Sequence, residues 1–268
     1  MDLGIAGRAA VVTGASTGIG LAVAHELVQN GASVVIAARD PARLATAASA
    51  LRERPGARVA TVSVDVADPD AAGRVVEVAV QAFGRLDILV NNAGRAHAGG
   101  LMAATDAEWD DMTAVKLTAA RRMCRAAIPV MRENAWGRIV NMSSIGGTHP
   151  NPKLFVSHVL SAAIDNLTKS LAIEVGAEGI LVNAIGVGAV ATENWANNMI
   201  PALRRARPEL HGLSDDAVLS RVSRELTPVG RAGRPAEIAA LAAFLASDRN
   251  GFVTGAVVHA AGGAERFL

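Results

Sequence analysis

The stretch that decides the fold is Thr13-Gly14-Ala15-Ser16-Thr17-Gly18-Ile19-Gly20, close to the start of the chain. It follows an apolar run, Ala9–Thr13, which is typical of a buried strand. It leads into residues 18–30, whose apolar spacing predicts a helix that ends at Gly31. Glycines between a strand and a helix permit a tight turn and a close approach of the backbone to a pyrophosphate, which the N–H groups at the helix start would bind. The stretch therefore predicts a dinucleotide site.

Strand-like and helix-like stretches alternate along the rest of the chain. The apolar runs predict further strands at 33–37, 58–64, 86–91, 138–142, 181–185 and 256–260. Helical spacing predicts helices at about 41–53, 69–83, 106–133, 155–177 and 235–247, the third of which begins with a capping box at Thr105 and Glu108. Such alternation is typical of βαβ units. It predicts a single α/β domain over residues 1–268, with a doubly wound, seven-stranded parallel sheet and helices on both faces.

Composition limits the class of protein. The 268 residues are 51% hydrophobic and 19% charged, which fits a globular fold with a sizeable core rather than a disordered or fibrous chain. The formal net charge of +1 gives no reason to expect a nucleic acid partner. Because Cys124 is the single cysteine and no cluster has metal-ligand spacing, neither disulfides nor a metal site are expected. The absence of a signal-peptide pattern and of a long apolar run predicts a cytoplasmic protein without a membrane span.

The least regular stretch is 189–230, which is rich in arginine, proline and asparagine. Long excursions in compact α/β domains are often functional, so we expect a substrate lid at about 189–226, with a surface decoration as the alternative. Trp195, Met199 and Leu203 have helical spacing. They would either form an apolar wall of the substrate pocket or pack the lid against the rest of the domain. The charged residues of this stretch would either meet a charged substrate or face solvent; they are Glu193, Arg204, Arg205 and Arg207.

Further motifs accompany the glycine stretch, whose spacing is Gly-x-x-x-Gly-x-Gly. They are Asn91-Asn92-Ala93-Gly94, Asp65-Val66, Gly188 with Thr192, Pro228-Val229-Gly230-Arg231 and Gly262-Gly263. With these residues the chain resembles the short-chain dehydrogenase/reductase family, in its single-domain form, from about Leu3 to Gly263. The resemblance implies a Rossmann-type fold, a nicotinamide cofactor and a small-molecule substrate. It also implies a homo-oligomer, a tetramer or a dimer, formed through the helices at 106–133 and 155–177.

The resemblance implies which residues bind the cofactor. Asp65, followed by Val66, would face the adenine, and Asn91 would lie beneath the adenine ribose. Val190 and Thr192 would hold the carboxamide end of the nicotinamide. The other residues that match the family's cofactor motifs are Gly14, Ser16, Thr17, Gly18, Ile19, Gly20, Ala93, Gly94 and Gly188.

The end of the second predicted strand indicates which nicotinamide cofactor is preferred. An NAD site usually places an acid near this point to accept from the ribose 2′-hydroxyl, whereas here Ala38 is followed by Arg39. A guanidinium can pair with a 2′-phosphate through charge-assisted hydrogen bonds. We therefore expect NADP(H) rather than NAD(H). The alternative is that Arg39 is solvated and Asp40 takes the hydroxyl.

The catalytic positions depart from the family. Its members reduce carbonyls with a serine, a tyrosine and a lysine, helped by an asparagine from the preceding helix. Ser144 matches the serine, but the tyrosine, lysine and asparagine positions hold Ser157, Ser161 and Lys116. The chain contains no tyrosine, so no displaced copy of the phenol exists. A serine hydroxyl is a poor substitute as acid/base near neutral pH.

Two basic side chains are candidates to replace the missing tyrosine and lysine. Lys116 could extend into the space vacated at Ser161 and there hold the ribose or act as the acid; alternatively it extends to solvent. His149, five residues after Ser144, is our first histidine candidate for the proton donor, unless it makes only a local hydrogen bond. His158 is a weaker candidate for the proton donor, because one residue along a helix turns its side chain about 100° away from that of Ser157.

Three classes of function follow. The first is an NADP(H)-dependent reductase of a preactivated acceptor (an iminium, an enone or an activated ketone), for which loss of the tyrosine is tolerable. The second is a non-redox enzyme for hydrolysis, isomerisation or cyclisation, in which Ser144 or Ser157 pairs with Lys116. The third is a noncatalytic homologue that acts as a binding or scaffold subunit.

Overall fold

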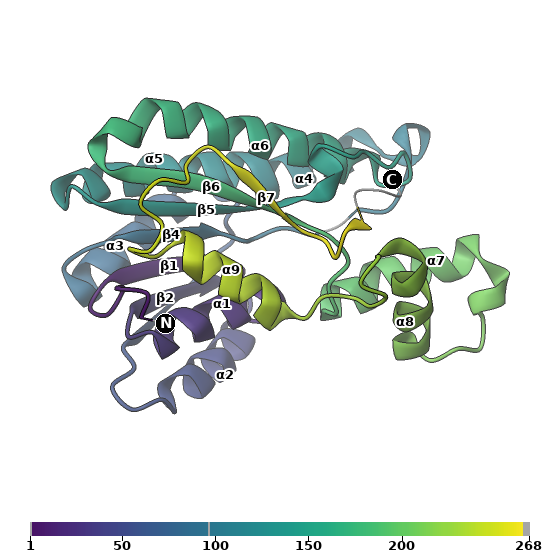
Figure 1. Ribbon diagram of the computed structural model, residues 1–268, viewed down its shortest axis with the longest axis horizontal. Coiled ribbons are helices and arrows are strands. Elements are labelled where there is room, and N and C mark those ends of the chain that lie inside the picture. Colours follow the sequence, from purple (N-terminus) through teal and green to yellow (C-terminus); the bar gives the residue numbers. More distant parts are fainter. Residues whose placement is uncertain (1, 96, 265–268) are drawn as a thin grey trace.

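The computed structural model describes residues 2–95 and 97–264. Within them, seven strands form one sheet in the order β3-β2-β1-β4-β5-β6-β7, and every neighbouring pair is parallel (Figure 1). The predicted fold class is therefore confirmed. The strands are β1 Ala9–Thr13, β2 Ser33–Ala38, β3 Val59–Ser63, β4 Ile88–Asn91, β5 Gly137–Ser144, β6 Ile180–Val187 and β7 Val257–Ala260.

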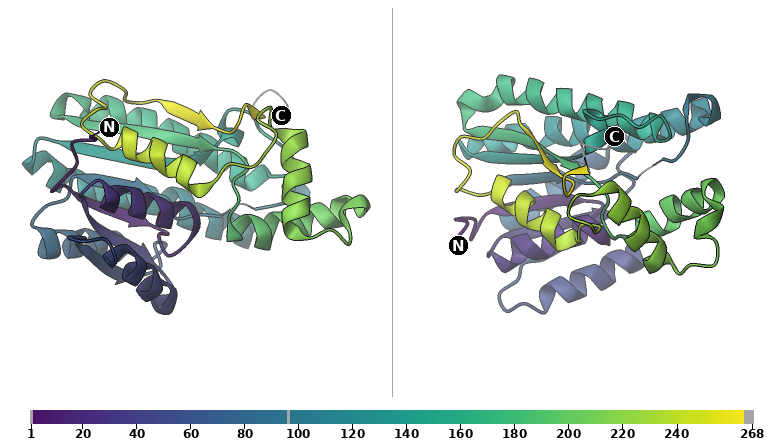
Figure 2. Two further views of the ribbon diagram at one scale, coloured as in Figure 1. Left: turned by 60° about the horizontal axis from the view of Figure 1, so that its bottom comes forward. Right: turned by 45° about the vertical axis from the view of Figure 1, so that its right-hand side comes forward.

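Helices cover both faces of the sheet, because alternate strand residues point to opposite faces and both sets are apolar. On one face Ala10 and Val12 of β1 pack with α1 Gly18–Gln29, α2 Pro41–Arg52 and α9 Pro235–Leu245. On the other face Val11 packs with α3 Ala71–Phe83, α5 Ala119–Glu133 and the end of α6 Phe155–Val175. Figure 2 shows these two helical layers from a second direction. The predicted helices are confirmed to within two residues at each boundary.

The helix predicted at 106–133 has the expected ends but is not regular throughout. Its start, α4 Asp106–Thr113, carries the predicted capping box, in which Glu108 N donates to Thr105 Oγ1 at 3.3 Å and Thr105 N donates to Glu108 Oε2 at 2.8 Å. Between α4 and α5 the chain widens into a π-helical turn, Ala114–Thr118. Such turns occur frequently at functional sites, and this one carries Lys116.

The stretch after β6 forms its own small helical unit beyond the carboxyl ends of the strands (Figures 1 and 2). It contains a π-helical turn, Trp195–Met199, followed by α7 Ile200–Ala206 and α8 Asp215–Leu226. Ile200, Leu210, Val218 and Val222 form a separate apolar cluster there, against which Trp195 and Leu203 pack. No helix of the described residues is long and apolar enough to cross a membrane. No metal-ligating cluster of three His, Cys, Asp or Glu occurs in the same part of the chain.

The glycine stretch is fixed by a side chain from the neighbouring strand. Asn92, just after β4, donates from Nδ2 to the carbonyls of Thr13 at 2.9 Å and Gly14 at 3.1 Å. Thr13 Oγ1 accepts in return from Asn92 N at 3.0 Å and Ala93 N at 3.1 Å. Gly14 has φ +63°, a conformation that favours glycine. A Cβ on Gly20 would overlap both the Asn92 amide and the Gly14 carbonyl, so the turn requires glycine there.

We expect Gly20→Ala to lower the free energy of unfolding by about 1–3 kcal/mol, because the added methyl group must displace backbone or the Asn92 amide. Urea unfolding followed by circular dichroism measures this change. Gly73→Ala is the matched control, because Gly73 lies in α3 with nothing within 4 Å of an added Cβ. It should leave stability equal or raise it by up to about 1 kcal/mol. Equal effects of the two substitutions would contradict the packing argument.

Candidate active site

A cleft of about 780 Å³ opens at the carboxyl ends of the strands. One wall comes from the glycine stretch, including Thr17, Gly18 and Ile19, and from Gly94 after β4. A second wall comes from the end of β5, including Ser144, and from Ser157 at the start of α6. The third comes from the α7–α8 unit with Trp195, Met199 and Leu203. The cleft therefore brings together glycine-motif residues and catalytic candidates that are far apart in the sequence.

The cofactor side of the cleft has free hydrogen-bond donors. Thr17 is the N-cap of α1 but its side chain caps no N–H group in the described chain, so the first N–H groups of the helix lack a side-chain partner. Gly18, Gly188, Val190 and Thr192 line the same cleft, as the family motifs imply. A Cβ on Gly18 would lie 3.6 Å from Thr192, so only a small gap separates these two segments. This cradle fits the pyrophosphate and nicotinamide of a dinucleotide.

The residues at the end of β2 differ in how they are engaged. Asp40 is the N-cap of α2, where its Oδ1 accepts from Ala42 N at 2.9 Å and Arg43 N at 3.1 Å. Arg39 is exposed, and its Nη1 lies 3.7 Å from Asp65 Oδ2. Asp65 in turn accepts from Ala67 N at 2.9 Å through Oδ1. Asp40 Oδ1 thus already caps α2, whereas the exposed Arg39 guanidinium is held by a single ion pair with Asp65 at 3.7 Å.

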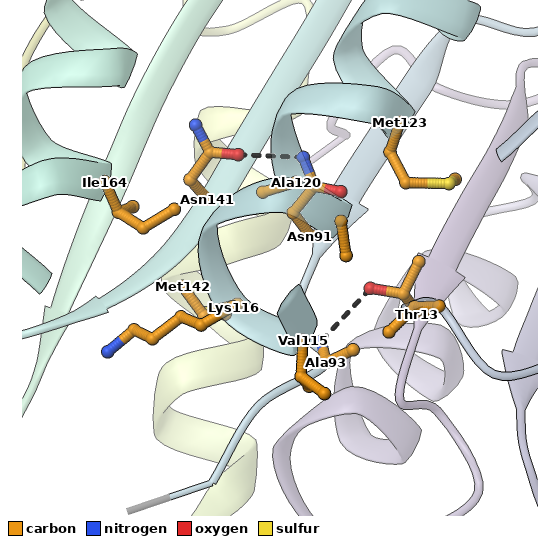
Figure 3. A pocket seen from close by; sticks show the side chains of 12 residues that line it. Thr13, Asn91, Ala93, Val115, Lys116, Ala120, Met123, Asn141, Met142 and Ile164 are labelled. Carbon is orange, nitrogen blue, oxygen red and sulfur yellow. Dashed lines mark hydrogen bonds between the residues drawn. The ribbon is translucent and has the colours of Figure 1, made fainter. Parts of the chain in front are cut away.

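Asn91 belongs to a buried polar network in the centre of the sheet (Figure 3). Its Nδ2 donates to Asn141 Oδ1 at 2.9 Å, and Asn141 Nδ2 donates to Thr168 Oγ1 at 2.9 Å. Asn91 Oδ1 has no partner among the described residues and borders a cavity of about 10 Å³, which is the size of one water. Cys124 lies beside it, and burial raises the pKa of the thiol to about 12.

Lys116 reaches Ser161 on α6, as one of the two alternatives from the sequence expected. Its Nζ donates to Ser161 Oγ at 2.6 Å and to the Ser157 carbonyl at 3.3 Å. Ser161 is fully buried, and its hydroxyl donates to the same carbonyl at 2.8 Å. Figure 3 shows the lysine side chain extending away from the Asn91–Asn141 pair. The π-helical turn of Ala114–Thr118 therefore directs an ammonium group toward α6 rather than to solvent.

Burial controls the protonation of the groups around Lys116. Burial lowers the pKa of Lys116 to about 8, although the nearby Asp165 carboxylate opposes this change. The pKa of His158 falls to about 4, first because the ring is buried and then because it lies near Lys116. Burial raises the pKa of Asp165, while the nearby Ser143 hydroxyl and the charge of Lys116 act against it. At neutral pH the site therefore holds an ammonium group beside a neutral imidazole.

The histidines are arranged differently from our expectation. His149 packs edge-on against His259, with ring centroids 5.7 Å apart, and it is not among the described residues that line the cleft. His158 lines the cleft instead, and its Nδ1 accepts from Asn151 N at 2.8 Å. Gly146 makes this possible, because a Cβ there would overlap the His158 ring. The glycine pair after Ser144 was the sequence signal for this close approach.

Comparisons with known proteins now identify the family. A family model described as enoyl-(acyl carrier protein) reductase matches residues 14–265. The (2S)-[(R)-hydroxy(phenyl)methyl]succinyl-CoA dehydrogenase subunit BbsD of Thauera aromatica is 35% identical over 268 residues, with 99% of both chains covered. The chain belongs to the short-chain dehydrogenase/reductase family. It is thus an NAD(P)-dependent oxidoreductase of that family.

Two solved structures of the short-chain dehydrogenase/reductase family agree with this fold. L-sorbose reductase from Gluconobacter frateurii, complexed with NADPH and L-sorbose, superimposes with a TM-score of 0.93 at 36% identity and complete coverage of both chains. A short-chain oxidoreductase from Pseudomonas aeruginosa, described as containing an atypical catalytic center, gives a TM-score of 0.88 at 33% identity. The match covers 97% of this chain and 98% of that one.

The lowered pKa of Lys116 predicts a pH-dependent stability. Between about pH 8 and the ordinary lysine pKa, near 10.4, the unfolded chain binds more protons than the folded protein, so stability rises with pH. Lys116→Met removes this contribution. The unaltered protein should therefore gain about 2 kcal/mol of unfolding free energy over the variant when the pH rises from 8 to 10. Denaturant titrations at both pH values measure it, and a constant difference would show that Lys116 titrates normally.

Proposed function

We propose that the protein is an NADPH-dependent reductase of an activated ketone or enone, in which Lys116 takes over the work of the missing tyrosine and lysine. The observation that carries this proposal is the 2.6 Å hydrogen bond from Lys116 Nζ to Ser161 Oγ, on the border of the cleft into which the glycine stretch opens. Bound NADPH supplies a hydride. The chain's own groups must then stabilise and protonate the oxygen that becomes negative.

The charge of the site favours one kind of acceptor. Hydride addition to a ketone or an enone places negative charge on oxygen, and a partly buried ammonium stabilises that charge strongly. The Ser144 hydroxyl accepts from Gly146 N at 3.2 Å and retains its own proton for a substrate oxygen. An iminium acceptor is disfavoured, because it brings a positive charge next to Lys116. With a pKa of about 8, Lys116 holds its proton at neutral pH yet releases it readily.

The hydrogen bonds argue against a serine–lysine hydrolase. Among the described residues, Lys116 Nζ makes no hydrogen bond to the hydroxyl of Ser144 or of Ser157, the two candidate nucleophiles. Lys116 meets Ser157 through the backbone carbonyl, at 3.3 Å from Nζ. A nucleophilic serine needs an adjacent base at its hydroxyl. These contacts favour the redox function over the non-redox alternative.

Two further features support the arrangement of the reductase. The residues 189–226 would close over the substrate, because Trp195, Met199 and Leu203 face the cleft while an ion pair between Glu193 and Arg43 joins this lid to α2. Val159 and Ile173 leave exposed apolar surface on α6, which suits the homo-oligomer expected through α4–α5 and α6.

Arg39 should select NADPH. We expect Arg39→Ala to raise the Kd for NADPH about ten-fold or more, because a charge-assisted contact to the 2′-phosphate contributes about 1.5–3 kcal/mol. The Kd for NADH should change less than about two-fold. Isothermal titration with each nucleotide measures both constants. Arg74→Ala, an exposed arginine of α3, is the control. Equal losses for NADPH and NADH would assign Arg39 no selective role.

Lys116 should be needed for reduction. With NADPH and a panel of α-diketones and enones, we expect Lys116→Met to lower kcat/KM about 100-fold or more. In the unaltered protein kcat/KM should fall above about pH 8, as the ammonium loses its proton, and the variant should lack this limb. Lys169→Met, an exposed lysine of α6, should behave like the unaltered protein.

The panel also separates the three classes of function. Binding of NADPH without oxidation by any acceptor would contradict the reductase proposal and direct attention to cofactor-free turnover. An unchanged pH profile in Lys116→Met would leave the redox function standing but remove Lys116 from the reaction.

A further inference from the structure

The charged residues on the cleft wall are not balanced. Its two described acidic residues are both engaged, because Glu193 pairs with Arg43 and Glu225 Oε2 lies 2.6 Å from Arg207 Nη1. Lys153 and Arg205 also line the cleft, and neither side chain has an ion-pair partner among the residues that the structure describes. Lys116 also lines the cleft, but it donates to Ser161 and to the Ser157 carbonyl. Lys153 and Arg205 are therefore the remaining cleft cations that pair with no acid among the described residues.

Arg205 differs from its neighbours on the lid in this respect. Arg204 Nη2 donates to the Leu213 carbonyl at 2.7 Å and lies 2.8 Å from Asp215 Oδ1. Arg207 donates to Glu209 at 2.7 Å and also holds Glu225. These two arginines tie α7 to the segment that contains α8. Arg205 takes no part in these contacts; like Arg207 it lines the cleft, but unlike Arg207 it has no ion-pair partner among the described residues.

Lys153 comes from the opposite wall, in the loop between β5 and α6. That loop is held through the backbone of Lys153: its N–H donates to the Asn151 side chain, at Oδ1, at 2.9 Å, and its carbonyl accepts from Gly99 N at 2.8 Å. Its side chain is exposed and lines the same cleft as Ser144 and Ser157. The two cations thus belong to different elements, one on the body and one on the lid.

The surface between these walls is apolar, with Trp195, Met199, Leu203 and Leu226 contributed by the lid. We propose that the acceptor of this reductase is an apolar molecule with an anionic group, which Lys153 and Arg205 bind away from the reacting carbon. This rests on the proposed function for the identity of the acceptor, but the anion site itself does not. A carboxylate and a phosphate monoester share the required chemistry. Both cations would contribute to affinity, and binding would weaken with salt.

Binding without turnover tests the site. The probes are phenylacetate, phenyl phosphate and phenylacetamide, each titrated into the NADPH-loaded protein by isothermal calorimetry. We expect at least one anionic probe to bind at least ten-fold tighter than the neutral amide, and the tighter anion identifies carboxylate or phosphate as the natural group. Lys153→Met with Arg205→Met should abolish this preference while the Kd for NADPH changes less than two-fold.

The control is the double variant Lys169→Met with Arg224→Met, which removes the same charge from exposed positions that do not line the cleft. It should retain the preference for the anionic probe. Equal binding of the anionic and neutral probes, or an equal loss in both double variants, would overturn the inference.

Turnover separates this inference from the proposed function. If phenylglyoxylate is reduced and its methyl ester is reduced at least ten-fold less efficiently, both proposals stand. If anionic probes bind by way of Lys153 and Arg205 but no acceptor consumes NADPH, the reductase proposal fails and the anion site remains. If neutral acceptors are reduced as well as anionic ones, the reductase remains and the anion site is overturned.

Discussion

The side chain of Asn92 holds together the carboxyl ends of β1 and β4, and the site depends on this. A parallel sheet leaves the loops after its strands free to move, since their backbone groups have no ladder partners. Here the Asn92 amide satisfies the carbonyls of Thr13 and Gly14, and Thr13 Oγ1 satisfies two N–H groups after β4. The glycine stretch is therefore preorganised, and the N-terminus of α1 points into the cleft at a fixed distance from β5 and α6.

Two features of the site around Lys116 lower the stability of the folded protein. Burying an ammonium destabilises the folded protein, and the lowered pKa of Lys116 corresponds to about 3 kcal/mol at neutral pH. The chain keeps the group there with the Ser161 hydroxyl, the Ser157 carbonyl and the nearby charge of Asp165. The π-helical turn is a second departure from the most stable backbone, and it lies at the same residue. Such concentrated departures are expected where function, not stability, selects the residues.

Lys116, Ser157 and Ser161 form one hydrogen-bonded group. The Ser161 hydroxyl accepts from Lys116 Nζ, and both groups donate to the Ser157 carbonyl. His158, held neutral and oriented by the Asn151 N–H group, occupies the border of the cleft.

The sequence by itself determined the order of strands and helices, the glycine turn and the capping box, because each depends on residues that are neighbours along the chain. It left two alternatives for Lys116, a contact with Ser161 or extension to solvent, and the tertiary structure shows the contact. Only the tertiary structure decided that Asn92 fixes the glycine stretch and that His158 rather than His149 lines the cleft. It also decided that Arg205, unlike Arg204 and Arg207, has no partner among the described residues. The reason is physical: these outcomes depend on which distant side chains come within hydrogen-bonding distance. Arg43 and Glu193, which are 150 residues apart, are one such pair, and no local pattern records it.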